Sequence, residues 1–274
     1  MMAVIRERGC GMACPICSGK MEPCFTAQVL GKYPAQYEVC KGCGFLRAHE
    51  PHWLDEAYSS AIAAADTGLV MRNIALACKL SGALYWIVGE RGEGRYLDAA
   101  GGYGMLTRLM RDVGFDFYWA DKHCANLLAP GFEYRQAQGP CRAVTAMEVM
   151  EHLTDPAAFV EETLAFSGAP MLLFTTELYE GPPPAPGAWW YYAFSTGQHI
   201  GFFQRRTLEA LAAGLGFRFA SANGLHVFSK TAVSERLLRK VTGRWLSRAA
   251  PWWIRRRLGS KTMSDHELML QSIS

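Results

Sequence analysis

The stretch YLDAAGGYG, from Tyr96 to Gly104, decides the fold that we expect for this chain. It is a short apolar run interrupted by one acidic residue, Asp98, and followed at once by a turn that contains three glycines. Glycines between a strand and a helix let a ligand approach the backbone at the carboxyl edge of a parallel sheet. We therefore predict the first strand and the first helix of an α/β domain on the two sides of this turn.

The segments beyond the turn alternate between short apolar runs and helical patterns, which indicates a parallel sheet with crossover helices. The chain ends this pattern with two strands that turn at Asn223 and Gly224, a pair typical of tight hairpins. The predicted strands are 95–100, 115–121, 143–147, 171–177 and the two arms of 217–230. The predicted helices are 103–114, 155–168 and one that begins at Thr207 and ends at Gly214 or Gly216.

Composition agrees with a folded chain, because 50% of the 274 residues are hydrophobic and 19% are charged. No apolar run reaches the roughly 18 to 20 residues that span a bilayer, and the first residues lack the apolar stretch of a signal peptide. We therefore expect a cytoplasmic protein whose nine cysteines stay reduced.

Four cysteines form two C-x-x-C pairs, Cys14 with Cys17 and Cys40 with Cys43, separated by 22 residues. Two such pairs supply the four thiolates of a tetrahedral structural zinc site, which would staple a module too small to fold on its own core. The pattern predicts a zinc-ribbon-like module at residues 1–54. Four reduced cysteines without a metal are the alternative, and Cys10 or Cys24 could replace one of the ligands.

The ligand of the glycine turn is indicated by charge. The dinucleotide fingerprint G-x-G-x-x-G does not match, because its third glycine falls on Thr107. A carboxylate at Asp98 would repel a pyrophosphate but suits an ammonium or sulfonium group, and S-adenosylmethionine carries both. Asp121 stands 17 residues beyond Gly104, at the end of the next predicted strand, where an acid can accept hydrogen bonds from ribose hydroxyls.

These residues resemble the motifs of class I S-adenosylmethionine-dependent methyltransferases. LDAAGGYG is similar to the first motif of that family, Asp121 takes the place of its ribose-binding acid, and AMEVMEHLTDP (146–156) is similar to its E-x-x-E-H segment. The resemblance covers Arg95 to Lys230 and implies a Rossmann-like fold, a mostly parallel seven-stranded sheet with a closing antiparallel hairpin. Ala99 and Ala100 depart from the family, which often has Gly or Cys there.

The resemblance also implies a set of cofactor-binding residues on the carboxyl edge of the sheet. Met147 and Glu148 would lie near the adenine or the methionine part of the cofactor. For His152 two roles stay open, a substrate contact and a buried side chain that holds the turn. The expected cofactor-binding residues are Asp98, Gly101, Gly102, Tyr103, Gly104, Asp121, Met147 and Glu148.

A narrower resemblance rests on WWYYAFSTGQHIGFF (189–203) together with the cysteine pairs. It is similar to a methyltransferase subgroup with an N-terminal zinc-binding segment that is found with surface-sugar and secondary-metabolite genes and includes sugar C-methyltransferases. His199 in this stretch is the first candidate for a general base, because an imidazole titrates near neutral pH. A histidine that only pins the loop by hydrogen bonds is the alternative.

The C-terminal part, residues 231–274, is a basic helical tail. Between Lys230 and Lys261 ten Lys or Arg residues face one acid, Glu235, and tryptophans are interleaved with them. Such a mixture suits the inner membrane surface or a lipid-linked phosphate, and it also suits RNA. A helical pair that packs on the core with a solvated basic face is the third possibility.

The sequence thus predicts three parts: the zinc module at 1–54, a methyltransferase domain at 55–230 with a helical lead-in at 55–92, and the tail at 231–274. The expected reaction is methyl transfer from S-adenosylmethionine to oxygen or carbon of a small-molecule or glycan-linked acceptor, with structural Zn²⁺ as the second cofactor. An RNA methyltransferase and a non-catalytic S-adenosylmethionine-binding or zinc-scaffold protein are the alternatives. The oligomeric state is not predicted.

Overall fold

The structure, a computed structural model, describes residues 13–58 and 66–273. Its chain divides into two compact units. We call Met1–Ser59, Glu151–Ala157 and Glu177–Leu215 the ribbon unit, and Ser60–Met150, Ala158–Thr176 and Gly216–Ser274 the sheet unit.

This division differs from the three-part organisation expected from the sequence, with its boundaries after residues 54 and 230. That organisation stays a prediction. The ribbon unit takes two later segments of the chain, and the sheet unit includes the whole tail. The Thr207 hydroxyl shows why, because it donates a hydrogen bond of 2.8 Å to the Cys43 carbonyl and so ties the later segment to the second cysteine pair.

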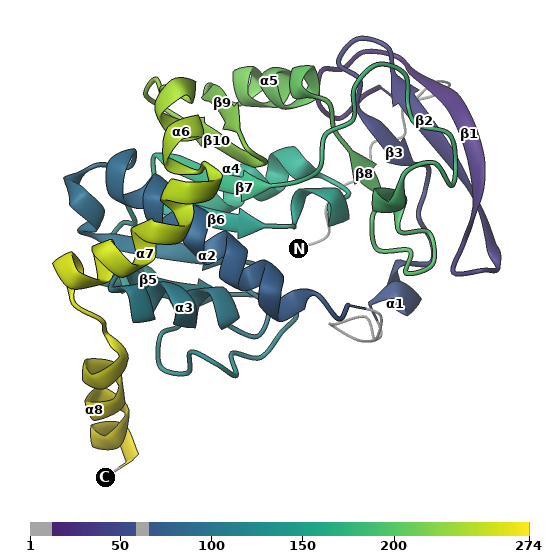
Figure 1. The fold of residues 1–274 in the computed structure, drawn as a ribbon. Helices are drawn as coiled ribbons and strands as arrows, with labels where there is room; N and C mark the ends of the chain where they lie inside the picture. Colours follow the sequence, from purple (N-terminus) through teal and green to yellow (C-terminus); the bar gives the residue numbers. More distant parts are fainter. Residues whose placement is uncertain (1–12, 59–65, 274) are drawn as a thin grey trace. The chain divides into compact units, whose positions relative to one another are not determined.

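Six strands form the sheet of the sheet unit within the described residues (Figure 1). Their order is β5-β4-β6-β7-β10-β9, in which the first four are parallel and β10 runs antiparallel to both of its neighbours. This parallel-rich arrangement fits the predicted Rossmann-like fold. The strands are β4 (Arg95–Ala99), β5 (Asp116–Ala120), β6 (Ala143–Met147), β7 (Met171–Thr175), β9 (Arg218–Ala222) and β10 (Leu225–Ser229).

The expected number of seven strands is wrong for the described residues, which form six. At the β5 edge, Trp119 and Glu133 form a single parallel bridge, with a hydrogen bond of 2.8 Å from the Trp119 N–H to the Phe132 carbonyl. The pairing stops there because the chain turns into the 3₁₀ helix η2 (Gln136–Gln138). The closing hairpin is confirmed, and Asn223 (φ 54°) and Gly224 (φ 74°) have the left-handed backbone of a two-residue turn.

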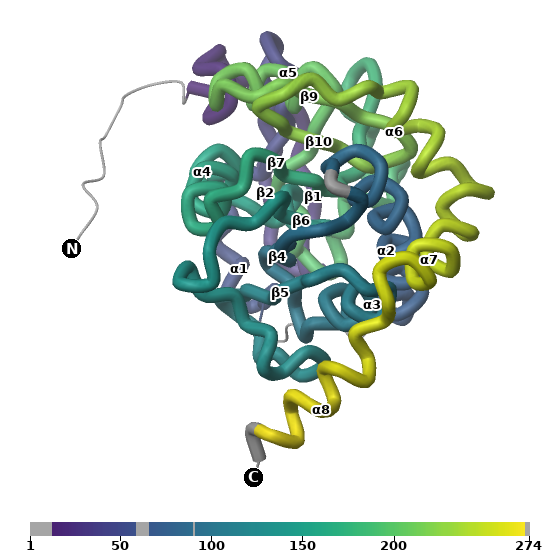
Figure 2. The backbone as a smooth tube through the Cα atoms, turned by 90° about the vertical axis from the view of Figure 1, so that its left-hand side faces the viewer, coloured from purple at the N-terminus to yellow at the C-terminus, as the bar shows by residue number. Residues whose placement is uncertain are grey.

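Helices cover both faces of this sheet. Figure 2 shows α4 on one face and α2, α3 and α7 on the other. The second group shares a core with the sheet, built around fully buried side chains such as Leu80, Tyr96, Phe117 and Leu173. The helices of the unit are α2 (Leu69–Trp86), η1 (Glu90–Gly92), α3 (Met105–Val113), most of α4 (Pro156–Ser167), α6 (Glu235–Val241), α7 (Arg244–Leu258) and α8 (Thr262–Ile273).

The tail packs on the core, which was one of its three expected roles. Ile254 of α7 is fully buried, and Trp253 stacks on Trp86 of α2 with ring centroids 5.8 Å apart. Helix α8 extends away from the sheet (Figure 1) and is anchored by the buried carboxylate of Asp265, which accepts hydrogen bonds of 2.7 and 2.8 Å from the Arg111 guanidinium. No helix within the described residues is both long and apolar enough to cross a lipid bilayer.

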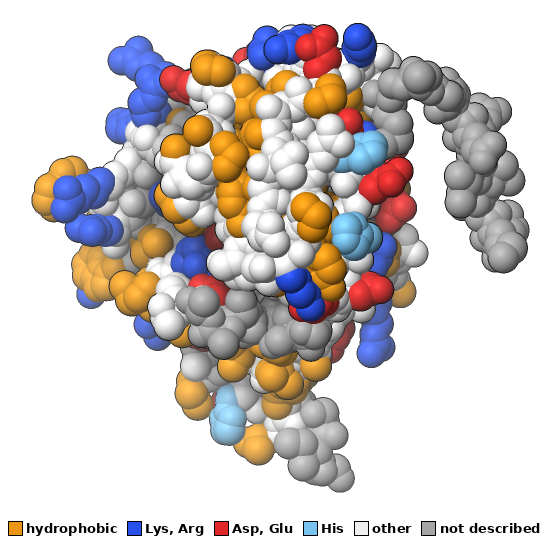
Figure 3. All heavy atoms as spheres, turned by 90° about the vertical axis from the view of Figure 1, so that its right-hand side faces the viewer, with side chains coloured by type: hydrophobic (Ala, Val, Ile, Leu, Met, Phe, Trp, Pro, Cys, Tyr) orange, Lys and Arg blue, Asp and Glu red, His pale blue; other side chains and the backbone are white. Residues whose placement is uncertain are grey.

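The ribbon unit is an antiparallel four-stranded sheet with an aromatic core. Its order is β1-β2-β3-β8, and the core includes Tyr37, Trp53, Tyr192 and Phe202. The elements are β1 (Met21–Val29), β2 (Tyr33–Cys40), β3 (Leu46–Ala48), α1 (Leu54–Ala57), η4 (Trp190–Tyr192), β8 (Gly201–Phe202) and α5 (Arg205–Gly214). The prolines of residues 180–187 lie in an irregular loop, as predicted. On the face shown in Figure 3, hydrophobic side chains lie among uncharged ones, and most charged side chains lie toward the margin.

Candidate functional site

The glycine turn between β4 and α3 is fixed by β5 and the residue that follows it. The Gly101 N–H donates to the Ala120 carbonyl at 3.2 Å, the Trp119 indole N–H donates to the Gly102 carbonyl at 2.8 Å, and the Gly102 N–H donates to Asp121 Oδ2 at 2.9 Å. The structure therefore brings together the turn and the acid that sequence reasoning selected separately. The remaining oxygen of Asp121, Oδ1, accepts the N–H groups of His123 and Cys124.

Two of the glycines are required by space or by conformation. A Cβ at Gly101 would lie 2.8 Å from Asp98 Oδ2 and 2.8 Å from Trp119 Cδ1. Gly104 has φ +85° as the residue that begins α3, a conformation that L side chains rarely adopt. Tyr103 between them is half-buried, and its carbonyl accepts the N–H groups of Leu127 and Leu128. A Cβ at Gly102 would meet nothing within 4 Å, so the turn is open to a close approach at this residue.

Asp98 lies beneath the turn with only 2% of its surface exposed. Its Oδ1 accepts a hydrogen bond from the Thr145 hydroxyl at 3.1 Å, and its Oδ2 accepts one from Thr107 at 3.2 Å. Burial raises the pKa of this carboxyl to about 7, against the two threonine hydrogen bonds, which lower it, and with a smaller upward contribution from the charge of Asp121. The carboxyl therefore titrates near neutral pH.

Met147 and Glu148 lie at the same carboxyl edge, at the end of the neighbouring strand β6. Glu148 has φ +56°, which is uncommon for a non-glycine residue and often found at functional sites. Its N–H donates to the Thr175 hydroxyl at 2.9 Å, and its carboxylate lies 2.6 Å from Nε of Arg72. Arg72 in turn binds Asp66 through two nitrogens, so the side chain of Glu148 belongs to an ion-pair network with α2.

The ribbon unit brings His152 and His199 together, although 46 residues separate them in the chain. Their ring centroids lie 4.8 Å apart at 81°. His199 Nδ1 lies 2.6 Å from the Tyr191 carbonyl, and His152 Nδ1 lies 3.0 Å from the Gln198 carbonyl and 2.9 Å from the Tyr58 hydroxyl. Burial lowers the pKa of His152 to about 4, so this imidazole is neutral at physiological pH.

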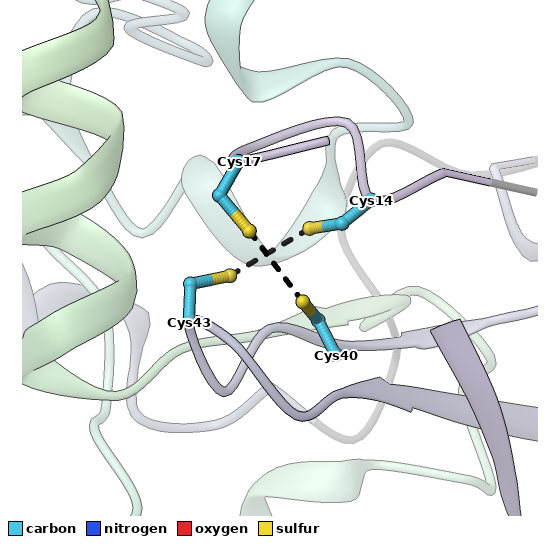
Figure 4. Close-up of side chains that lie close together, drawn as sticks. All are labelled: Cys14, Cys17, Cys40 and Cys43. Carbon is cyan, nitrogen blue, oxygen red and sulfur yellow. Dashed lines mark hydrogen bonds between the residues drawn. The ribbon is translucent and has the colours of Figure 1, made fainter. Parts of the chain in front are cut away.

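The four predicted cysteine ligands also lie together, in the ribbon unit. Figure 4 shows their sulfur atoms pointing toward one centre. Sγ of Cys14 lies 3.6 Å from Sγ of Cys43, and Sγ of Cys17 lies 3.5 Å from Sγ of Cys40. Ligands at about 2.3 Å from a tetrahedral zinc ion stand about 3.8 Å from one another, so the cluster fits this ion closely.

The surroundings favour the thiolate form of Cys14, whereas burial raises the pKa of Cys40 and the hydrogen bond to Cys14 raises that of Cys43. The Ile16 N–H donates to Sγ of Cys14 at 3.4 Å, and a hydrogen bond from the Cys43 thiol lowers the pKa of Cys14 to about 5. A Cβ at Gly19 would lie 3.2 Å from Sγ of Cys40. Cys24 is exposed and stands outside the cluster, and Cys10 lies outside the described residues.

Sequence reasoning missed several residues that hold these groups. In the sequence Trp119 looks like an ordinary strand residue, but its indole N–H donates the hydrogen bond to the Gly102 carbonyl that fixes the glycine turn. Glu151 is fully buried beside His152 and His199, and one ligand-capable atom from each of the three lies within 4.8 Å of the others. The sequence signal was present in the Glu-His pair itself, but only the fold shows that His199 joins it.

The sequence of this chain matches a known protein family over the region that contains these residues. Residues 74–222, more than half of the chain, match the methyltransferase domain family. This chain belongs to that family. The match contains the glycine turn, Asp121 and both histidines, and it confirms the predicted methyltransferase domain.

Several solved methyltransferase structures resemble this chain at low similarity. TnmH is 17% identical with a TM-score of 0.45, and the match covers 66% of this chain and 62% of that one. An O-methyltransferase family 2 protein from Planctomyces limnophilus in complex with apigenin is 14% identical, with a TM-score of 0.43 and coverage of 64% and 65%. Magnesium protoporphyrin IX methyltransferase from Synechocystis with bound SAH is 14% identical, with a TM-score of 0.40 and coverage of 65% and 91%.

This chain spans less than two thirds of the length of the first two of these proteins. No curated protein matches it. The narrower resemblance to the subgroup with an N-terminal zinc-binding segment is not confirmed by these matches and stays a prediction.

Proposed function

We propose that this protein transfers the methyl group of S-adenosylmethionine to oxygen or carbon of a small-molecule or glycan-linked acceptor. The observation that carries the proposal is the clamp of Asp121 and Trp119 on the open backbone of Gly102, within a chain of the methyltransferase domain family. In this proposal the glycine turn and Tyr103 bind the methionine part of the cofactor. Asp121 accepts hydrogen bonds from the ribose hydroxyls, and Met147 and Glu148 line the same pocket.

Methyl transfer is an in-line displacement, in which the acceptor atom attacks the methyl carbon while the bond from that carbon to sulfur breaks. An acceptor hydroxyl or carbon acid reacts faster when a base removes its proton. His199 is the first candidate for this base. Its Nδ1 faces a carbonyl, which can only accept a hydrogen bond, so Nδ1 carries a proton and Nε2 is the basic nitrogen of the neutral ring.

An acceptor subsite in the ribbon unit is supported by a cavity of about 200 Å³. Among its lining residues are Leu153 and Ile200, the chain neighbours of His152 and His199, together with Arg47 and Glu50. A cavity with an apolar wall and a few charged groups suits a small polar acceptor. Trp189 and Trp190 contact Tyr191, whose ring lies against His199, and such aromatic residues suit stacking on a sugar ring.

The direct test is calorimetric titration of the zinc-loaded protein with S-adenosylmethionine and, separately, with NAD. We expect micromolar binding of S-adenosylmethionine alone, and binding at least tenfold weaker in Asp121→Ala. Glu162→Gln, which changes an exposed acid on α4, is the matched control and should bind as the wild type does. Binding of NAD instead, or equal binding by Asp121→Ala, would overturn the assignment of the turn.

The same titration can show whether Asp98 faces the positive charge of the cofactor, through the protons that are released on binding. A bound sulfonium or ammonium group beside this carboxyl would favour its charged form, so binding at pH 7 would release a proton. The measured enthalpy would then depend on the ionisation enthalpy of the buffer in the wild type and not in Asp98→Asn. Equal enthalpies in phosphate and Tris would mean that Asp98 supports the turn without facing the charge of the cofactor.

We also propose that Cys14, Cys17, Cys40 and Cys43 hold a structural zinc ion. Four thiolates close the coordination shell, so the ion would stabilise the ribbon unit and take no part in the chemistry. One zinc per chain is expected by elemental analysis, and Cys40→Ser should release it and unfold the ribbon unit. Cys24→Ser, outside the cluster, is the control.

Peripheral contact with a membrane is the proposed use of the exposed side of the tail. Trp245 and Trp252 are 79% and 61% exposed, and the Arg256 guanidinium lies 3.7 Å from the centre of the Trp252 ring. Cationic and indole groups together favour an anionic lipid surface. Vesicles with phosphatidylglycerol should bind the wild type more tightly than Trp252→Ala, and phosphatidylcholine vesicles should bind neither. Stronger binding to single-stranded RNA than to vesicles would favour the RNA alternative.

A further inference from the structure

Three ligand-capable side chains converge in the ribbon unit apart from the cysteine cluster. Glu151 and His152 stand on the 3₁₀ turn η3 (Met150–His152), and His199 lies in the segment just before β8. The Ile200 N–H donates to the Glu151 carbonyl at 2.8 Å, which fixes the two segments against each other. One ligand-capable atom from each of the three side chains lies within 4.8 Å of the others.

The contacts of the two imidazoles show which nitrogen of each ring faces a carbonyl. Nδ1 of His199 faces the Tyr191 carbonyl and Nδ1 of His152 faces the Gln198 carbonyl, so both Nδ1 atoms carry the proton. In the neutral form of each ring, Nε2 is then the nitrogen whose lone pair a metal ion would bind. A histidine that binds a metal through one nitrogen almost always donates the other N–H to a carbonyl or carboxylate, as both of these do.

The third group supplies the negative charge. Glu151 is fully buried, so its carboxylate is held on the site by packing as well as by the turn that carries it. Two imidazoles and one carboxylate on one side of an ion form the ligand set of many first-row transition-metal sites that keep open positions. The set differs in chemistry from the four thiolates, which prefer softer ions and close the shell.

We propose that Glu151, His152 and His199 bind one divalent first-row transition-metal ion through the two Nε2 atoms and the carboxylate. Metal–ligand distances of about 2.0–2.2 Å place neighbouring ligands about 3.4 Å apart. Side-chain movements on the order of an ångström close the cluster to that spacing. The remaining positions on the ion are open to water or to an acceptor oxygen.

Metal binding and the role of His199 as a general base are mutually exclusive, because both use the lone pair of Nε2. A metal bound to Nε2 excludes the role of a free base, and the ion would instead polarise an acceptor oxygen bound in an open position. Metal binding itself does not depend on methyl transfer. The proposal can therefore fail while the proposed function stands, and the reverse.

The test uses the full chain with zinc already on its cysteines, and cobalt(II) as the probe. We expect the wild type to bind one cobalt ion with the weak visible bands of nitrogen and oxygen ligands, without the intense thiolate charge-transfer bands. Glu151→Gln, His152→Ala and His199→Ala should each bind it on the order of 100-fold more weakly. His266→Ala removes an exposed histidine of α8 and should bind cobalt as the wild type does.

Thermal unfolding separates a lost site from a misfolded chain. Cobalt should raise the midpoint of the wild type and of His266→Ala, because an ion that binds the folded state stabilises it. Cobalt should leave the unfolding midpoint of Glu151→Gln unchanged. It should also leave that of His199→Gln unchanged, although this variant keeps a donor for the Tyr191 carbonyl. Absence of a second ion in the wild type at millimolar cobalt, or unchanged binding in Glu151→Gln and His199→Gln, would overturn the proposal.

Discussion

The glycine turn and the histidine cluster are assembled in opposite ways. The turn is made within one βαβ unit, where β4, α3 and β5 follow one another and Asp121 binds Gly102 across 19 residues. The cluster needs two segments of the ribbon unit, residues 151–157 and 177–215, which stretches of the sheet unit separate from the cysteine module and from each other. A local site tolerates distant changes, whereas a site built from distant segments depends on the core that joins them.

Gly101→Val should have the largest effect on the turn. Its Cβ would lie 2.8 Å from both Asp98 Oδ2 and Trp119 Cδ1, and neither neighbour has room to move. We expect the loss of about 3 kcal/mol of stability in the sheet unit and cofactor binding on the order of 100-fold weaker. Denaturant unfolding and calorimetric titration measure the two effects.

The control for this variant is Gly214→Ala at the end of α5, where an added Cβ meets nothing within 4 Å. It should change neither stability nor cofactor binding by more than a few tenths of a kcal/mol. If Gly101→Val bound the cofactor as the wild type does, the turn would not be the cofactor site. Cobalt binding by the histidine cluster should survive Gly101→Val, since the two sites belong to different units.

The second largest effect concerns the pH dependence of stability. The pKa of Asp98 is about 7 in the folded chain and near 3.8 when exposed, so the folded state keeps a proton that the unfolded state releases between these values. The contribution of this group is fully present below about pH 4 and is lost as the pH rises through 7. The free energy of unfolding should fall on the order of 2 kcal/mol between pH 5 and 7 from this group alone.

Asp98→Asn removes that titration while keeping the shape of the side chain and groups that can pair with Thr107 and Thr145. The difference in unfolding free energy between variant and wild type should therefore grow in favour of the variant from pH 5 to pH 7. Urea unfolding at three pH values measures it. A constant difference over this range would show that Asp98 is already ionised at pH 5, against the burial seen here.

The contrast between the two sites also explains what the sequence could predict. The strand, the glycine turn and Asp121 lie close in the chain, and the spacing of apolar residues and glycines marks them. The partnership of His199 with Glu151 depends on the hydrogen bond from the Ile200 N–H to the Glu151 carbonyl, which no local pattern encodes. The prediction of a seventh strand was wrong for a related reason. The segment around Glu133 forms one bridge to Trp119 and then turns away from the sheet.

Trp53→Phe tests whether the histidine cluster depends on the core of the ribbon unit. The Trp53 indole N–H donates to the Gly197 carbonyl at 2.9 Å, two residues before His199, and the ring is 2% exposed. Loss of this bond and of part of the ring should cost about 1.5 kcal/mol of stability. Cobalt should also bind more weakly, while S-adenosylmethionine binding stays unchanged.

Trp190→Phe is the matched control, because Trp190 belongs to the same unit but is 78% exposed. It should change stability by less than 0.5 kcal/mol, as surface substitutions usually do. Equal losses of cobalt affinity in the two variants would contradict the idea that the buried indole positions the segment of His199. Urea unfolding and the visible cobalt spectrum provide both readouts.

Trp119→Phe should have the smallest effect and separates the two supports of the turn. The phenyl ring keeps most of the apolar contact but loses the hydrogen bond of 2.8 Å to the Gly102 carbonyl, while Asp121 still holds the N–H of the same residue. We expect a loss of about 1 kcal/mol and a cofactor affinity reduced roughly fivefold. Trp245→Phe, at an exposed tryptophan of α7, should leave both unchanged. If Trp119→Phe bound the cofactor as tightly as the wild type does, Asp121 alone would be enough to hold the turn open, and the indole would serve only the stability of the sheet edge.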